Sequence, residues 1–208
     1  MTNALRMITA FTSLFAGTTT VPDSASSHAQ AKPAIVMIGM SQAEQQGALR
    51  SAALFTEAGL DLPPVTIRRH PDTTACNGHE GLHHKDGGRS VIDICTQTSG
   101  ALEERMILHE LSHAWAFHYL TPEHKLAFKT VRGWDSWLDY AKAEWKDNGA
   151  EQAAEIMVWG LSDHPVQPIK ISGTTCSELH DGYVALTGLE PLHGYTDLCD
   201  ETVKALRS

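Results

Sequence analysis

An apolar stretch that contains two histidines and a glutamate, residues 105–120, constrains this chain more than any other part of its sequence. It reads RMILHELSHAWAFHYL and contains the pattern H-E-x-x-H at His109, Glu110 and His113. In an α-helix, residues four positions apart lie on one face, so both imidazole rings can reach one metal ion, with Glu110 beside a water on that ion. The surrounding apolar side chains predict a buried helix. A bound metal ion would offset the cost of burying these polar groups.

The same short pattern occurs a second time, at His79, Glu80 and His83, within the segment NGHEGLHHKDGG. The glycines in and around this copy predict a loop or a wide hairpin turn rather than a helix. Without a helix, the spacing of the histidines does not direct both rings to one ion. We therefore interpret this copy as accidental, with a metal-binding surface loop as the alternative.

A catalytic zinc site needs a third protein ligand and an open position. The metzincin arrangement would require Gly at 116 and His at 119, but this chain has Ala116 and Tyr119. The segment GAEQAAEIMVWGL at 149–161 is typical of a second packed helix and carries Glu151 and Glu155 four residues apart. Glu151 is the candidate third ligand, and Glu155 is the candidate acceptor of a hydrogen bond from a ligand imidazole. The alternative is that both are ordinary residues of a polar helix face.

The sequence HELSH followed by EQAAE resembles the gluzincin metallopeptidases, a group that includes thermolysin-like and lethal-factor-like enzymes. The resemblance covers about residues 101–161. It implies a bound zinc ion, a general base and a carboxylate that supports a ligand histidine. The residues that match these roles are His109, His113 and Glu151 as zinc ligands, Glu110 as the base and Glu155 as the supporting carboxylate.

The order of predicted elements favours an α+β fold of the zincin type, with a small sheet packed on the active-site helix and a mainly helical C-terminal part. Besides residues 105–120 and 149–161, the predicted elements are strands at 34–39, 65–70 and 90–95 and helices at 41–58, 122–131 and 177–187. In zincins, a strand at the sheet edge beside the metal helix binds the substrate backbone. We expect residues 90–95, or the strand that pairs with them, to have this role.

Residues 1–31 have the features of a targeting segment, followed by a single domain at 32–208. Arg6 precedes a short apolar stretch at 7–17, and Ala29-Gln30-Ala31 matches an A-x-A cleavage pattern. We therefore expect a secreted or periplasmic bacterial protein. The alternative is a disordered N-terminal extension.

The chain contains four cysteines, an even number that indicates two disulfides in an exported protein. Three pairings are possible, and the local one joins Cys76 to Cys95 and Cys176 to Cys199. The alternative is a cytosolic protein with four free buried thiols.

The net charge of the chain restricts the classes of partner that it can bind. Lys and Arg number 16 against 25 Asp and Glu, a net charge of −9, which argues against nucleic acid and against an anionic membrane. No apolar run approaches the roughly 20 residues of a membrane span. We expect a monomer that acts on a peptide or protein.

The leading functional hypothesis is zinc-dependent hydrolysis of peptide bonds, with Glu110 as the general base. The alternative is a catalytically inactive binding module that zinc stabilises, and a hydrolase of other amides would use a similar site. His180, Tyr183, His193 and Tyr195 are candidate donors to the developing oxyanion, and the sequence does not choose among them. Further candidates for a substrate cleft, or for packing alone, are Trp134, Trp137 and Trp145.

Overall fold

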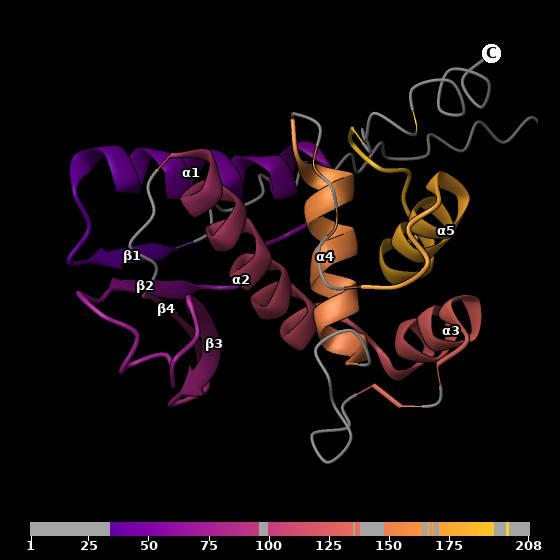
Figure 1. The fold of residues 1–208 in the computed structure, drawn as a ribbon, viewed down its shortest axis with the longest axis horizontal. Helices are drawn as coiled ribbons and strands as arrows, with labels where there is room; N and C mark the ends of the chain where they lie inside the picture. Colours follow the sequence, from indigo (N-terminus) through magenta and orange to yellow (C-terminus); the bar gives the residue numbers. More distant parts are fainter. Residues whose placement is uncertain are drawn as a thin grey trace, which may run out of the picture. The chain divides into compact units, whose positions relative to one another are not determined.

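The computed structural model describes residues 34–95, 100–134, 136–137, 148–163, 166, 168, 171–193 and 199. These residues form a mixed four-stranded sheet and five α-helices, which confirms the predicted α+β class (Figure 1). Within them, no helix combines the length and the apolar character that crossing a bilayer requires. The predicted targeting segment, residues 1–31, lies outside the described residues.

The sheet has the strand order β1 (Ile35–Ile38), β2 (Val65–Arg69), β4 (Arg89–Ile94) and β3 (Gly81–Asp86). β1 runs parallel to β2, and β2 runs parallel to β4. β3 is antiparallel to β4 and forms one edge of the sheet. The three strands predicted from the sequence are all present. β4 is an inner strand, so of the two strands considered for the edge position, the partner strand β3 occupies it.

The prediction that the second H-E-x-x-H copy is not helical is confirmed, but residues 81–86 form the strand β3 of a hairpin rather than a loop. This strand pairs with β4 along its whole length, from Gly81 opposite Ile94 to Asp86 opposite Arg89. The cross-strand pairing outweighs the poor strand propensity of glycine. The tight turn of the hairpin lies at Gly87 and Gly88, whose φ angles of 56° and 83° favour glycine.

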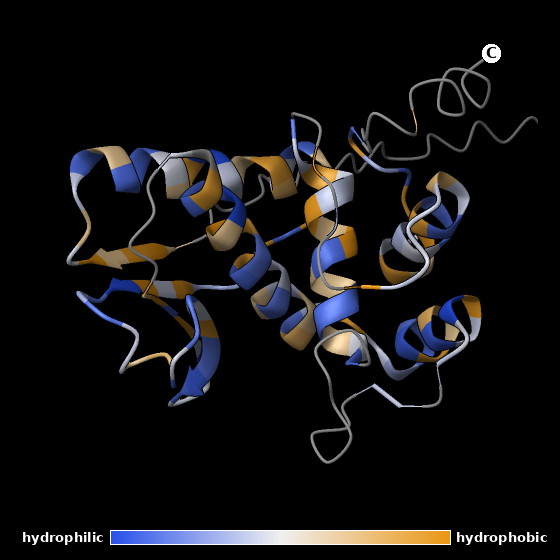
Figure 2. Cartoon of the chain, viewed as in Figure 1, coloured by the Kyte–Doolittle hydropathy of each residue, from blue (hydrophilic) through white to orange (hydrophobic). Residues whose placement is uncertain are grey.

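Five helices surround the core: α1 (Gln42–Glu57), α2 (Ala101–Tyr119), α3 (Pro122–Arg132), α4 (Gly149–Leu161) and α5 (Cys176–Thr187). Their ends lie close to those predicted. α2 packs against α1, against the sheet strands β3 and β4, and against α4, while α4 also packs against α5 (Figure 1). Every residue of α4 from Gln152 to Leu161 is buried. Figure 2 shows hydrophobic and hydrophilic segments in turn along this helix, so its buried surface includes polar side chains.

The structure contains two disulfides, Cys76–Cys95 and Cys176–Cys199, and no free cysteine. This is the local pairing considered from the sequence. The first bond joins the loop before β3 to the residue after β4 and so closes the hairpin that forms this edge of the sheet.

Candidate metal centre

Helices α2 and α4 together bring two histidines and a glutamate to one point. His109 and His113 lie one turn apart on α2, and Glu151 lies in the first turn of α4. Asn148 caps α4 by accepting a hydrogen bond from the backbone N–H of Ala150, which fixes where this first turn begins. Because α2 and α4 pack directly against each other, the three side chains meet between them.

The three side chains present their ligand atoms to each other at nearly equal distances. The Nε2 atoms of His109 and His113 lie 3.1 Å apart, and each lies 3.2 Å from Oε2 of Glu151. Three donor atoms in a nearly equilateral triangle could all contact a single ion. Within the described part of the chain, no other group of three His, Cys, Asp or Glu side chains converges in this way.

A buried carboxylate supports this group from behind. The Nδ1 atom of His109 lies 3.0 Å from Oε1 of Glu155, and Oε2 of Glu155 pairs with Arg105. His109 and Glu155 are only 2% and 1% exposed. In the neutral ring, a hydrogen bond from Nδ1–H to this carboxylate places the lone pair on Nε2, the atom beside Glu151 and His113. Glu155 therefore has the position expected of a supporting carboxylate.

The charges of these groups depend strongly on each other. Burial lowers the pKa of His109, but the carboxylates of Glu151 and Glu155 outweigh burial and raise it to about 10. Burial raises the pKa of Glu151, but its hydrogen bonds with His109 and His113 outweigh that effect and hold the pKa well below its usual range. Without a metal ion, the group therefore holds a protonated His109 paired with ionised carboxylates, and a metal ion would take the place of the proton on Nε2.

Glu110 lies next to the triangle but is not part of it. Its side chain is buried, and burial raises the pKa of its carboxyl group above the ordinary value, against the opposing effect of His109 and His113. The carboxylate accepts a hydrogen bond from the backbone N–H of His83 on β3. A Cβ atom on Gly81 would lie 2.6 Å from Oε1 of Glu110, so this glycine is needed for β3 to approach the carboxylate.

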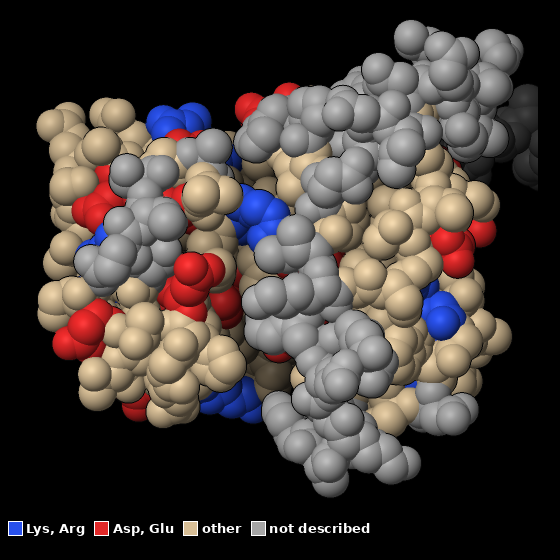
Figure 3. Space-filling model, viewed as in Figure 1, with Lys and Arg blue, Asp and Glu red and all other residues tan. Residues whose placement is uncertain are grey.

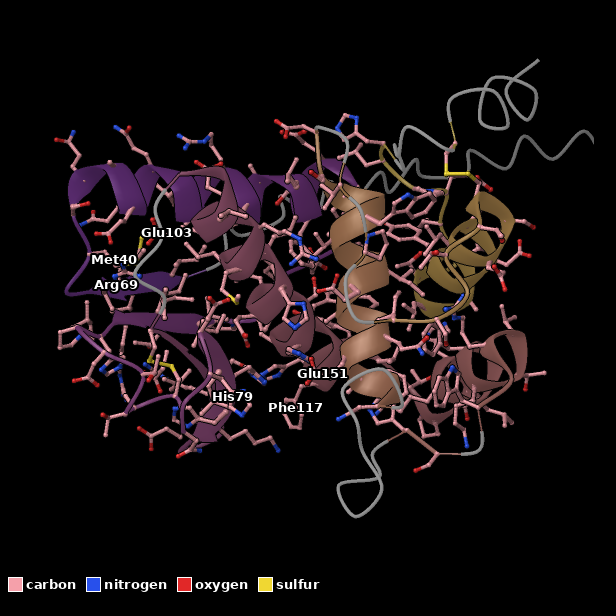
Figure 4. The ribbon with its side chains drawn as sticks, in the orientation of Figure 1. Met40, Arg69, His79, Glu103, Phe117 and Glu151 are labelled. Carbon is pink, nitrogen blue, oxygen red and sulfur yellow. A yellow bond between two sulfur atoms is a disulfide. The ribbon has the colours of Figure 1, made fainter. Side chains whose placement is uncertain are left out.

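The group opens onto a cavity of about 700 Å³. In the space-filling view a recess borders the part built on the sheet, with acidic side chains visible beside and inside it (Figure 3). Figure 4 shows Glu151 on the α4 side and His79 and Phe117 on the sheet side. Lining side chains come from α2 (Glu110, His113 and Phe117), from the loop before β3 and β3 itself (His79 and His83), and from α3 and α4 (Lys125 and Glu151).

The second H-E-x-x-H copy therefore contributes to the site, although not as a metal group. His79 and His83 line the cavity, whereas Glu80 is exposed and no metal cluster of described residues includes this copy. The sequence alone did not indicate this contribution. The signal that could have revealed it is Cys76, because a disulfide-anchored segment is held in a defined place.

The downstream candidates for an oxyanion donor do not line the cavity among the described residues. His180 pairs with Glu190, and Tyr183 is buried between α4 and α5. His193 donates its backbone N–H to the carbonyl of Gly160. Tyr195 and Trp145 lie outside the described residues, and of the other two tryptophans only Trp137 lines the cavity.

Two histidines and a glutamate that could hold a metal ion, with a buried glutamate beside them and a cavity in front, make this a candidate metal centre. Comparison of the chain with protein-family models, with curated proteins and with solved structures gives no match. A functional proposal for this chain therefore depends on the chemistry and geometry of the centre itself.

Proposed function

We propose that this protein is an exported zinc-dependent peptidase of the gluzincin type. The observation that supports zinc is the spacing of the three donor atoms, 3.1 to 3.2 Å. A tetrahedral zinc ion with bonds of about 2.0–2.1 Å separates its ligand atoms by about 3.3 Å. Two imidazole nitrogens and one carboxylate oxygen are also a ligand set that zinc enzymes use.

The number of ligands supports a catalytic rather than a structural ion. Structural zinc sites usually have four protein ligands, whereas catalytic sites have three and an open position. Among the described residues the group has three members, and it faces a cavity. The open position would therefore point to where a substrate can enter.

A bound zinc ion supplies Lewis acidity, which makes a water molecule more acidic and polarises a substrate carbonyl. Glu110 takes the proton from the attacking water and passes it to the leaving amine. Burial raises the pKa of Glu110, which makes the carboxylate a stronger base. Glu155 holds the His109 ring in place, and the hydrogen bond from His83 N–H fixes the Glu110 carboxylate.

Glu110 also favours an enzyme over a zinc-stabilised binding module. A binding module would need His109, His113 and Glu151, but it would have no use for a fourth ionisable group that is buried and lies outside the ligand triangle. Burying a carboxylate costs free energy, and a role as a base accounts for that cost. The two disulfides support export, because such bonds persist in oxidising compartments.

The first experiment is zinc analysis of the purified full chain and of Glu151→Gln. We expect about one zinc per chain in the wild type and loss of zinc in the variant, since a catalytic zinc site has three protein ligands. Zinc absent from the wild type would refute the proposal, and zinc retained by Glu151→Gln would refute the ligand assignment.

The second experiment tests catalysis with Glu110→Gln. We expect this variant to keep its zinc and to lose about 10²–10⁴-fold in cleavage of a random peptide library, followed by mass spectrometry. Glu80→Gln is the matched control, because it makes the same change in the other H-E-x-x-H copy at an exposed position. Equal cleavage by Glu110→Gln and Glu80→Gln would exclude Glu110 as the base.

A further inference from the structure

Two lysine–aromatic pairs lie at the cavity, and their lysines come from two different elements, β3 and α3. The Nζ atom of Lys85, on β3, lies 3.6 Å from the centroid of the Phe117 ring. The Nζ atom of Lys125, on α3, lies 5.4 Å from the centroid of the Trp137 ring. Phe117, Trp137 and Lys125 line the cavity, and Lys85 covers the Phe117 ring. We call these four residues the cationic rim.

The lysines of the cationic rim have no carboxylate partner among the described residues. Their ammonium groups instead face the aromatic rings of Phe117 and Trp137. An aromatic ring attracts a cation through one face only and does not neutralise its charge. The remaining sides of each ammonium group can therefore bind an anion.

The acidic side chains that line the cavity belong, among the described residues, to the metal centre alone. They are Glu110 and Glu151. Lys125 is the one lysine or arginine among the described lining residues, and Lys85 adds a second cation over the Phe117 ring. The border of the cavity is therefore positively charged at these two points, although the whole chain carries a net charge of −9.

The rest of the described lining is part apolar and part polar. Leu82, Ala116 and Ala150 extend the apolar surface of Phe117 and Trp137, and the polar side chains are His79, His83 and Asn148. An apolar wall with a cation at its border suits a peptide in which an apolar side chain stands next to an acidic one.

We propose that the cleft selects peptides with an acidic side chain close to the scissile bond, and that Lys85 and Lys125 are the residues that determine this specificity. The inference rests on the proposed peptidase function and names its substrate class. Because each ammonium group lies over an aromatic ring, its position is restricted before a substrate binds, and its other sides stay open to a substrate carboxylate. Part of the ordering cost of a lysine side chain is thereby removed before the substrate binds.

The test measures binding without turnover, on zinc-loaded Glu110→Gln protein fixed to a support. The probes are three octapeptide libraries, each randomised except for one central position that is Glu, Gln or Lys. We expect the Glu library to be retained about 3–10-fold more strongly than the Gln library, the range that one or two exposed charge pairs provide. The Lys library should be retained least.

Lysine variants in the same protein show which residues cause the preference for the Glu library. Lys125→Met and Lys85→Met should each reduce the preference for Glu over Gln, and the double variant should abolish it. Lys129→Met is the matched control, because Lys129 lies one turn further along α3 and outside the cavity lining. Its preference should equal that of the parent protein.

Two results would overturn the inference: equal retention of the Glu and Gln libraries, or a Glu preference that survives in the double variant. Failure of the proposed function has a different signature, because it would appear as absence of peptide cleavage by the wild-type chain. Retention of the libraries does not require cleavage. The binding assay therefore tests the specificity, and the cleavage assay tests the peptidase function, independently of each other.

Discussion

The Nδ1 atom of His109 lies 3.0 Å from Oε1 of Glu155, and these are the most deeply buried ionisable side chains of the metal centre. Arg105 pairs with the other carboxylate oxygen, so both oxygens of Glu155 have a partner inside the protein. This arrangement orients the His109 ring from the side opposite the point where a metal ion would bind. A carboxylate in this place makes the ring nitrogen that faces the ion a better donor.

Glu155→Gln should therefore weaken zinc binding by about 10–100-fold, because the ring of His109 loses its charged partner. Competition with a chromophoric chelator measures this affinity. Glu104→Gln is the matched control, since Glu104 also pairs with an arginine, Arg50, but away from the centre. Equal zinc affinity in the two variants would contradict the role given to Glu155.

Removal of zinc should lower the free energy of unfolding, because the ligands come from two helices that the ion joins. At a free zinc concentration about 1,000 times the Kd, the expected loss is about 4 kcal/mol. Denaturant unfolding with and without a chelator measures it. Glu151→Gln, which lacks one ligand, should respond far less to the chelator, and a wild-type chain indifferent to the chelator would argue against a bound ion.

Gly81→Ala should reduce turnover while zinc remains bound. The added Cβ would lie 2.6 Å from Oε1 of Glu110 and 2.9 Å from Sδ of Met106, so either the base or β3 must move. We expect a stability loss of about 1–3 kcal/mol, typical of overpacking, with turnover at least tenfold lower. Peptide cleavage and zinc content are measured on the same preparation.

A second tight glycine provides the control for this prediction. A Cβ on Gly182 would lie 2.9 Å from Cδ1 of Ile156, away from the cavity lining. Gly182→Ala should cost similar stability and leave turnover unchanged. A parallel loss of turnover in both variants would mean that lower stability, not displacement of Glu110, is the cause.

The two disulfides should contribute similarly to stability but differently to the site. They join cysteines 19 and 23 residues apart, and loops of this length correspond to about 3 kcal/mol each. Replacing Cys76 and Cys95 with alanine should also impair substrate binding, because this bond anchors the segment that carries His79. Replacing Cys176 and Cys199 should lower stability alone.

Denaturant unfolding and the Michaelis constant for a cleaved peptide, measured on both double variants, separate these effects. An unchanged Michaelis constant after loss of Cys76–Cys95 would show that the bond does not position the cavity wall.

Much of the fold could be predicted because its signals are local. Ser41 and Thr121 precede helices and cap them, and the helix that carries Glu151 has the same limits in the structure as in the sequence pattern. The glycines around 79–83 correctly indicated that no helix forms there, but not that residues 81–86 form a strand, since glycine content is a local signal and an edge strand depends on a partner strand.

The cationic rim could not be predicted from the sequence either, because it depends on contacts between residues that are distant in the chain. Lys85 and Phe117 are 32 residues apart in the sequence, and neither has a local feature that indicates the other. In the sequence, residues 79–83 match only a metal-binding pattern, whereas in the structure His79 and His83 line the cavity. A search of the sequence for metal-binding patterns does not reveal that these histidines form a cavity wall, because the wall exists only when β3 packs beside α2.

The sequence by itself determined the donor residues and the spacing of the two histidines, because the helical repeat is a local property of the backbone. It also identified Glu151 and Glu155 as residues of one helix. Only the tertiary structure decided that α4 packs on α2 with Glu151 toward both histidines and Glu155 behind His109. The physical reason is that a helix fixes which side chains share a face, whereas the packing of buried apolar surfaces decides what each face meets.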